Sequence, residues 1–96
     1  MAVTILLEAY AKDGSVDELI DILNNKIFPD TRTYDGFIDI YIIQDQDNPN
    51  TIFLVEEWES KSNYDSYLQW RTERGDIDTL VSFLTGPPTI RYFKKR

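Results

Sequence analysis

The sequence predicts an α+β fold of the ferredoxin-like kind, in which a four-stranded antiparallel sheet carries its helices on one face. Three observations lead to this prediction. The chain has 96 residues and no linker or repeat, so residues 1–96 form a single domain. Its apolar fraction of 42% and aromatic fraction of 14% are typical of a chain that folds around a core. Strand and helix patterns follow one another as β-α-β-β-α-(α)-β, the order of a ferredoxin-like sheet.

The first strand and the first helix are predicted from the amino-terminal third. Residues 3–10 are rich in branched apolar side chains and are followed by turn formers at 12–14. Ser15 and Glu18 have the spacing of a capping box, so a helix should begin there. Because a residue before proline avoids α geometry, this helix should end just ahead of Pro29. Its apolar face consists of Val16, Leu19, Ile20, Leu23 and Ile27.

The remaining elements follow from turn formers and apolar spacing. Residues 37–43 and 51–58 read as two strands of a hairpin, because the stretch between them is dense in Asp, Asn and Pro. Residues 61–74 lack glycine and proline and carry apolar bulk at helical spacing, which predicts a helix. Asp76 can cap a short third helix, and residues 89–93 form the last strand.

Both faces of the first two predicted strands carry large apolar side chains. Two or three helices can cover only one face of a four-stranded sheet. The other face would expose an apolar patch too large to leave in water, which consists of Leu6, Tyr10, Phe37 and Tyr41. A second copy packed sheet to sheet would cover this patch, and we therefore expect a homodimer.

Composition excludes several classes of function. The chain has no Cys and no His, which removes the usual ligands of zinc, haem and iron–sulfur sites and the Cys and Ser-His-Asp nucleophile systems. A net charge of −7 opposes nucleic-acid binding. No Gly-rich dinucleotide loop appears, so we expect no cofactor and no metal. No apolar run is long enough to span a membrane and no signal peptide is recognisable, so we expect a cytoplasmic protein.

Chemistry-bearing side chains gather in the second half of the chain. Glu56 and Glu57 are neighbours in a strand and should point to opposite faces, so they cannot form a close acid–base pair, although one carboxylate could act alone as a base. Asn63, Tyr67 and Arg71 share a helix face. This face is compatible with a small aromatic core that leaves Arg71 exposed. It is also compatible with the wall of a pocket for a flat, oxygenated, apolar ligand.

The chain resembles the antibiotic biosynthesis monooxygenase family from Val3 to Phe93. The resemblance rests on Gly14 before the first helix, Gly36 before the second strand, the Asp47-Asn48-Pro49 hairpin and the segment Glu57-Trp58-Glu59-Ser60. It implies a ferredoxin-like protomer in a homodimeric α+β barrel. It also implies oxidation of phenols or quinols to quinones by molecular oxygen without a cofactor.

The resemblance further implies which residues form the site. Polyketide-tailoring members line their pocket with an Asn and a Trp one turn apart on the second helix, and the matching pair here is Asn63 and Tyr67. Haem-degrading members need a His, which this chain lacks, and an Asn in the first strand, where this chain has Leu7. We expect Asn63 and Tyr67 to bind the oxygens of the substrate and Arg71 to stabilise its anion. The expected pocket walls are Leu7, Trp58 and Trp70.

Two alternatives of the same fold stay open, namely a small-molecule isomerase and a ligand-binding dimer without turnover. An isomerase acting on an oxo acid would also use Arg71, together with Glu57 or Glu8 as its base. Oxygen uptake with a dihydroxynaphthalene would separate these functions from a monooxygenase.

Overall fold

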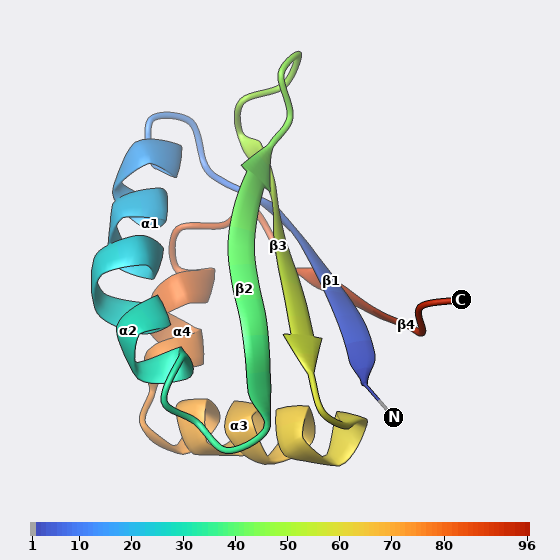
Figure 1. Ribbon diagram of the computed structural model, residues 1–96. Coiled ribbons are helices and arrows are strands. Elements are labelled where there is room, and N and C mark those ends of the chain that lie inside the picture. Colours follow the sequence, from blue (N-terminus) through green and yellow to red (C-terminus); the bar gives the residue numbers. More distant parts are fainter. Residues whose placement is uncertain (1) are drawn as a thin grey trace.

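The computed structural model describes residues 2–96 and confirms the ferredoxin-like α+β fold. Its four strands form one antiparallel sheet in the order β2-β3-β1-β4. The helical segments lie on one side of this sheet (Figure 1). The strands are β1 (Val3–Tyr10), β2 (Phe37–Gln44), β3 (Thr51–Trp58) and β4 (Thr89–Phe93), and the helical segments are α1 (Val16–Ile22), the π-helical turn η1 (Leu23–Ile27), α2 (Phe28–Thr31), α3 (Lys61–Glu73) and α4 (Asp76–Val81).

The first helical segment continues past Pro29, so the prediction that it ends there is wrong. The π-helical turn η1 is wider than an α turn and directly precedes α2. Pro29 falls in the first turn of α2, where a missing backbone N–H leaves no helical bond unmade. The continuation brings Phe28 into the core, where it is fully buried.

Side-chain capping occurs at α3 rather than at α1. Ser15 stands at the start of α1 but makes no side-chain capping bond, so the predicted capping box is wrong. Ser60 caps α3 instead, because its hydroxyl accepts the backbone N–H of Asn63 at 3.1 Å. This cap fixes the first turn of α3, on which Asn63 lies.

A β-bulge in β2 changes the side of the sheet to which Phe37 points. The pairing with β3 shifts between Phe37 and Asp39, and the ring of Phe37 packs edge-on against Trp58 with centroids 5.6 Å apart. The prediction that Phe37 shares the uncovered face with Tyr41 is therefore wrong, because alternation of side chains breaks at a bulge.

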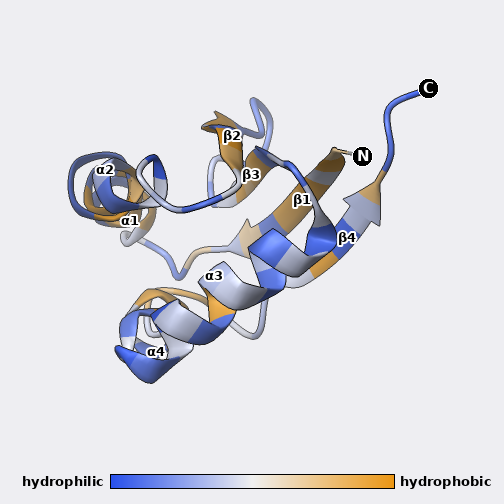
Figure 2. Ribbon diagram, turned by 60° about the horizontal axis from the view of Figure 1, so that its bottom comes forward, coloured by the Kyte–Doolittle hydropathy of each residue, from blue (hydrophilic) through white to orange (hydrophobic). Residues whose placement is uncertain are grey.

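The side of the sheet away from the helices, here called the open face, still exposes large apolar groups. Tyr10, Tyr41, Ile43 and Phe93 are each at least 40% exposed, and the strand registers place them on this side. Apolar colour follows the strands in Figure 2. The homodimer that would cover this face stays a prediction. Within residues 2–96, no helix has the length and apolar character needed to cross a membrane.

The core between the sheet and the helices has two parts. The aliphatic cluster is built around Ala9, Leu19, Leu23, Ile52, Leu54 and Leu84, with further apolar side chains packed against it. The aromatic cluster is built around Ile5, Trp58, Tyr64 and Tyr67. Because β1 and β3 contribute to both, the two clusters follow one another along the same strands.

Candidate functional site

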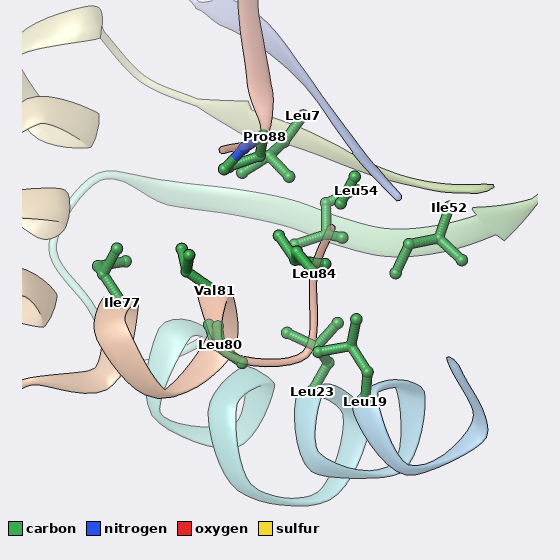
Figure 3. A pocket seen from close by; sticks show the side chains of 11 residues that line it. Leu7, Leu19, Leu23, Ile52, Leu54, Ile77, Leu80, Val81, Leu84 and Pro88 are labelled. Carbon is green, nitrogen blue, oxygen red and sulfur yellow. The ribbon is translucent and has the colours of Figure 1, made fainter. Parts of the chain in front are cut away.

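The aliphatic cluster contains a cavity of about 70 Å³ between the sheet and the helical segments α1, η1 and α4 (Figure 3). None of its lining side chains carries a hydrogen-bonding group or an aromatic ring. They are Leu7, Ala9, Leu19, Leu23, Ile52, Leu54, Ile77, Leu80, Val81, Leu84 and Pro88. Apolar walls favour apolar guests over polar ones. This cavity can therefore hold a hydrocarbon group or a diatomic gas, but it cannot bind a polar one.

The aromatic cluster is held by hydrogen bonds around the hydroxyl of Tyr67. This hydroxyl lies 2.7 Å from the hydroxyl of Thr31 in α2, and it accepts a hydrogen bond of 2.9 Å from Nε of Arg71. The ring of Tyr67 lies against the indole of Trp58, with centroids 4.9 Å apart. Burial raises the pKa of the Tyr67 phenol even though the bonds from Thr31 and Arg71 favour its anion, so the phenol is neutral.

Arg71 ties the helical segments together. Its side chain is only 2% exposed, and its two terminal nitrogens donate to the backbone carbonyl of Ile27 at 2.8 Å and to the carboxylate of Asp76 at 2.9 Å. Burial acts to raise the pKa of Asp76, but the hydrogen bonds from Arg71 and Arg74 hold it below its usual value. Arg71 therefore links the end of η1 to the start of α4 from a position inside the core.

Glu56 is a carboxyl group buried on the helix-facing side of β3. It is 4% exposed, and its neighbours on the adjoining strands, Ile5 and Ile40, are buried and apolar. Its hydrogen bond comes from Nε1 of Trp58, which donates to Oε1 at 3.0 Å. Burial raises the pKa of Glu56 to about 7, although the bond from Trp58 opposes that shift. This group can therefore take up or release a proton near neutral pH.

Tyr64 presents a buried hydroxyl with no hydrogen-bond partner among the described residues. Its ring is fully buried and packs edge-on against Trp58, with centroids 5.8 Å apart. Burial raises the pKa of this phenol, and the nearby charge of Glu56 adds to the shift. The hydroxyl is therefore a neutral hydrogen-bond donor whose proton is not used within the protein.

Asn63 lies where α3 meets the turn before β2. Its side-chain oxygen accepts a hydrogen bond of 2.6 Å from the hydroxyl of Ser60. Its side chain fills the space beside Gly36, whose φ is +85° and where a Cβ atom would lie 2.3 Å from Cγ of Asn63. Gly36 is thus required both by its backbone conformation and by the closeness of Asn63.

The structure brings most of the predicted site residues together, but not around the cavity. Tyr67, Arg71, Trp58 and Trp70 lie in or beside the aromatic cluster. Only Leu7 of the three expected wall residues lines the cavity, and Asn63 lies beside Gly36. The burial of Arg71 excludes the arrangement in which it is exposed.

Sequence reasoning left open which of Glu56 and Glu57 points inward, and it did not assign Tyr64 or Thr31 to the site. Glu56 alternates with Leu54 and Trp58 along the apolar side of β3, so its inward direction could have been read from the strand pattern. Glu57 points to the open face and pairs with Lys95 at 3.1 Å. No comparable signal marks Thr31, because its contact with Tyr67 joins positions 36 apart in the chain.

Comparison with known families and structures gives a consistent result. The family model described as antibiotic biosynthesis monooxygenase matches residues 2–72. No curated protein sequence matches this chain. The fold is similar to that of a conserved protein from Methanosarcina mazei, at 21% identity and a TM-score of 0.87 over 100% of this chain and 94% of that one.

Two similar structures are of oxygenases. One is a mutant of SnoaB, a cofactor-independent oxygenase from Streptomyces nogalater, with 15% identity and a TM-score of 0.84 over 99% of this chain and 93% of that one. The other is a monooxygenase from Streptomyces coelicolor in complex with nanaomycin D, with 16% identity and a TM-score of 0.79 over 99% of this chain and 87% of that one. At these identities the similarity shows the shared fold.

Proposed function

Because this chain belongs to the antibiotic biosynthesis monooxygenase family, we propose that it is a cofactor-independent monooxygenase that oxidises a phenol- or quinol-type aromatic to a quinone with molecular oxygen. The observation that carries the proposal is the apolar cavity between the sheet and the helices, which is next to a cluster of buried hydrogen-bonding groups along the same strands. The oxygenases of similar fold support it.

The reaction can be balanced without a cofactor. A phenol first loses a proton, because the phenolate gives up an electron to triplet oxygen far more readily than the neutral phenol does. The resulting superoxide and ring radical combine at a ring carbon, and the peroxide that forms takes up the proton. The O–O bond then breaks, the ring carbon loses its hydrogen, and one oxygen atom leaves as water while the other becomes the quinone carbonyl. The substrate supplies all four electrons.

The protein contributes binding, orientation and exclusion of water in this proposal. The aliphatic cavity of about 70 Å³ takes oxygen or a small apolar part of the substrate. We assign hydrogen bonding of the substrate oxygens to Asn63 and Tyr67, and we assign the wall of the aromatic cluster to Trp58 and Trp70. The donors of Arg71 are engaged with Tyr67, Ile27 and Asp76, so we assign it the positioning of the Tyr67 hydroxyl rather than direct contact with the substrate.

The expected homodimer belongs to this proposal, because a second copy would cover the open face. Tyr41 is half exposed on the edge strand β2, where it points to the open face and pairs with Val55 of β3. Tyr41→Asp should weaken association by burying an unpaired charge. Sedimentation measures this directly, and a wild-type monomer at micromolar concentration would contradict the proposed dimer.

The function is tested by oxygen uptake with a dihydroxynaphthalene, followed by mass spectrometry of the quinone formed under ¹⁸O₂. We expect one labelled oxygen atom in the product without any added cofactor. Asn63→Ala should lower turnover far more than it lowers the melting temperature, whereas Ser62→Ala, at an exposed position one residue away, should change neither. Absence of oxygen uptake, or a product without label, would contradict a monooxygenase.

The two carboxylates expected to act as the base of an isomerase do not point into the interior. Glu57 faces away from the helices and pairs with Lys95, and Glu8 lies on the open face, where it accepts a hydrogen bond from Tyr10. Neither carboxylate reaches the interior. Conversion of an oxo acid without oxygen consumption would restore this alternative.

A further inference from the structure

We propose that Glu56 and the hydroxyl of Tyr64 form the subsite that binds the phenolic oxygen of the substrate, and that Glu56 accepts its proton. This inference rests on the proposed function, which it deepens by naming the group of the substrate that is recognised and the base that ionises it. It stands on the position of Glu56 between the two clusters, on the lack of a cationic partner for its carboxyl group among residues 2–96, and on the unpartnered hydroxyl of Tyr64, whose pKa is raised by burial and in part by the nearby charge of Glu56.

The strand β3 places Glu56 at the boundary between the two parts of the core. Leu54, Glu56 and Trp58 point to the same side of the sheet, because side chains alternate along a strand. Leu54 lines the aliphatic cavity and Trp58 belongs to the aromatic cluster. Alternate residues on a strand are roughly 6.5 Å apart, so Glu56 is the inward-facing residue next to the cavity wall, and its carboxyl group accepts its hydrogen bond from Trp58 on the other side. A substrate ring with its apolar edge in the cavity can direct its hydroxyl toward Glu56.

Glu56 has no cationic partner among residues 2–96. The titratable groups that face it are the phenols of Tyr64 and Tyr67, both from α3, and β1 and β2 contribute only Ile5 and Ile40. The nearest buried cation, Arg71, is bonded to Tyr67 and Asp76 instead. A buried carboxyl group without a counter-ion costs stability, and such groups concentrate at functional sites.

Tyr64 supplies the complementary group. Its hydroxyl is buried and unpartnered, which is uncommon because buried polar groups in folded proteins are nearly always hydrogen-bonded. A phenolic oxygen can donate one hydrogen bond and accept others. A substrate phenol placed here can donate to the Glu56 carboxylate and accept from Tyr64, which satisfies both groups at once.

The proposed step is a proton transfer without oxidation or reduction. The O–H bond of the phenol breaks, its proton forms an O–H bond with the Glu56 carboxylate, and the phenolate keeps the electron pair. Tyr64 then donates to the phenolate oxygen. Nothing is oxidised in this step, which prepares the anion that oxygen attacks.

The hydroxyl subsite is tested by comparing 1-naphthol with naphthalene, two ligands that differ only by the hydroxyl group. Tyr64→Phe should weaken binding of 1-naphthol about fivefold, the value of one ordinary hydrogen bond, and should leave naphthalene binding unchanged. The matched control is Tyr34→Phe in the same cluster, whose hydroxyl lies 3.3 Å from Ser66 and should not matter. Equal losses for both ligands, or no loss, would show that the Tyr64 hydroxyl meets only a buried water or nothing.

The role of Glu56 is tested with 1-naphthol, which is neutral in solution at neutral pH and whose neutral and ionised forms absorb at different wavelengths. At neutral pH the wild-type protein should bind it as the phenolate, and Glu56→Gln should bind it with the neutral spectrum. The variant Glu59→Gln, at an exposed site three residues away, should behave as wild type. A neutral bound spectrum in the wild type, or an ionised one in Glu56→Gln, would overturn the assignment.

Turnover separates the failure of this inference from the failure of the proposed function. Glu56→Gln should slow oxidation of 1-naphthol about a hundredfold, the usual contribution of a general base, and should slow an already ionised nitronaphthol only slightly. If Glu56→Gln slows both substrates equally, the assignment of Glu56 as the base is wrong. Oxidation by the wild type would then still support the proposed monooxygenase activity. If the wild type binds the phenolate but consumes no oxygen, the monooxygenase fails and the subsite stands.

Discussion

The two halves of the core differ in how they fill their volume. The aliphatic cluster is built mainly from Leu, Ile and Ala side chains, together with the ring of Phe28, and leaves a cavity of about 70 Å³. The aromatic cluster holds fully buried rings and is crossed by hydrogen bonds from Arg71 and Thr31. Dispersion contacts have no preferred direction, whereas hydrogen bonds fix the atoms that make them. The comparison indicates that the aliphatic half leaves space for a guest, whereas the aromatic half holds polar groups in fixed positions. Glu56 lies between the two halves.

Removing the buried guanidinium should have the largest effect on this difference. Arg71→Met should lower the free energy of unfolding by about 4 kcal/mol, because it removes one charge-assisted hydrogen bond from each of Asp76, Tyr67 and the carbonyl of Ile27. Denaturation by urea measures the loss.

The control is Arg74→Met, which removes the other cation bonded to Asp76 from a side chain that is about half exposed. It should cost less than about 1 kcal/mol, as expected of a surface ion pair. Similar losses for the two variants would mean that the aromatic half does not depend on its buried hydrogen bonds.

The carboxyl group at the boundary should make stability depend on pH. The pKa of Glu56 rises from an ordinary value of 4.5 to about 7 on folding. Between these values the folded state holds a proton that the unfolded state has lost, so stability falls as pH rises through this window. The loss between about pH 5 and pH 8 should be roughly 2–3 kcal/mol.

The contribution of Glu56 is measured by comparing the free energy of unfolding of the wild type with that of Glu56→Gln at each pH. The other acidic groups are the same in both proteins, so their contributions cancel in the difference. The wild-type protein should lose stability relative to this variant as pH rises, and the variant should be the more stable of the two at about pH 8. Parallel profiles for the two proteins would show that Glu56 titrates normally.

Adding a larger side chain to the aliphatic cluster should have the smallest effect on stability. The sign of the change should differ between two alanines of similar burial. Ala9 and Ala11 are both 3% exposed and belong to the aliphatic cluster, but only Ala9 lines the cavity. Ala9→Val should raise the free energy of unfolding by about 1 kcal/mol and weaken naphthalene binding. Ala11→Val should destabilise by about 1–3 kcal/mol, because its surroundings are already full. Thermal unfolding distinguishes the two, and the same sign for both would argue against a usable cavity at Ala9.

The strands could be predicted from sequence because their alternation and their turns are local signals. The predicted strands at 3–10, 51–58 and 89–93 coincide with β1, β3 and β4, and β2 differs by one residue. The bulge near Asp39 left no such signal, and it turned Phe37 from the open face to the core. The π-helical turn also left no signal in the sequence. If the segment is read as a regular α-helix, Pro29 predicts that the helix ends there.

Only the part of the candidate site that lies on one face of a single helix could be predicted from the sequence. Tyr67 and Arg71 were singled out by their spacing, and both lie inside. Their partners could not be predicted, because the carbonyl of Ile27 is 44 residues from Arg71 in the chain and Thr31 is 40. The inward direction of Glu56 follows from its alternation with Leu54 and Trp58, but its lack of a cationic partner within the described part of the chain depends on side chains from other elements and could not be predicted locally.

The contact between Gly36 and Asn63 has a consequence for how this sequence can vary. In a library of all single substitutions, position 36 should retain only glycine, because any side chain would overlap Asn63. Gly14 has a similar φ of +80°, but a Cβ atom added there would meet nothing within 4 Å, so Asn and Asp should survive at that position. We therefore expect positions 36 and 63 to vary together, so that a residue able to adopt a positive φ could replace the glycine only after the side chain at position 63 has become shorter.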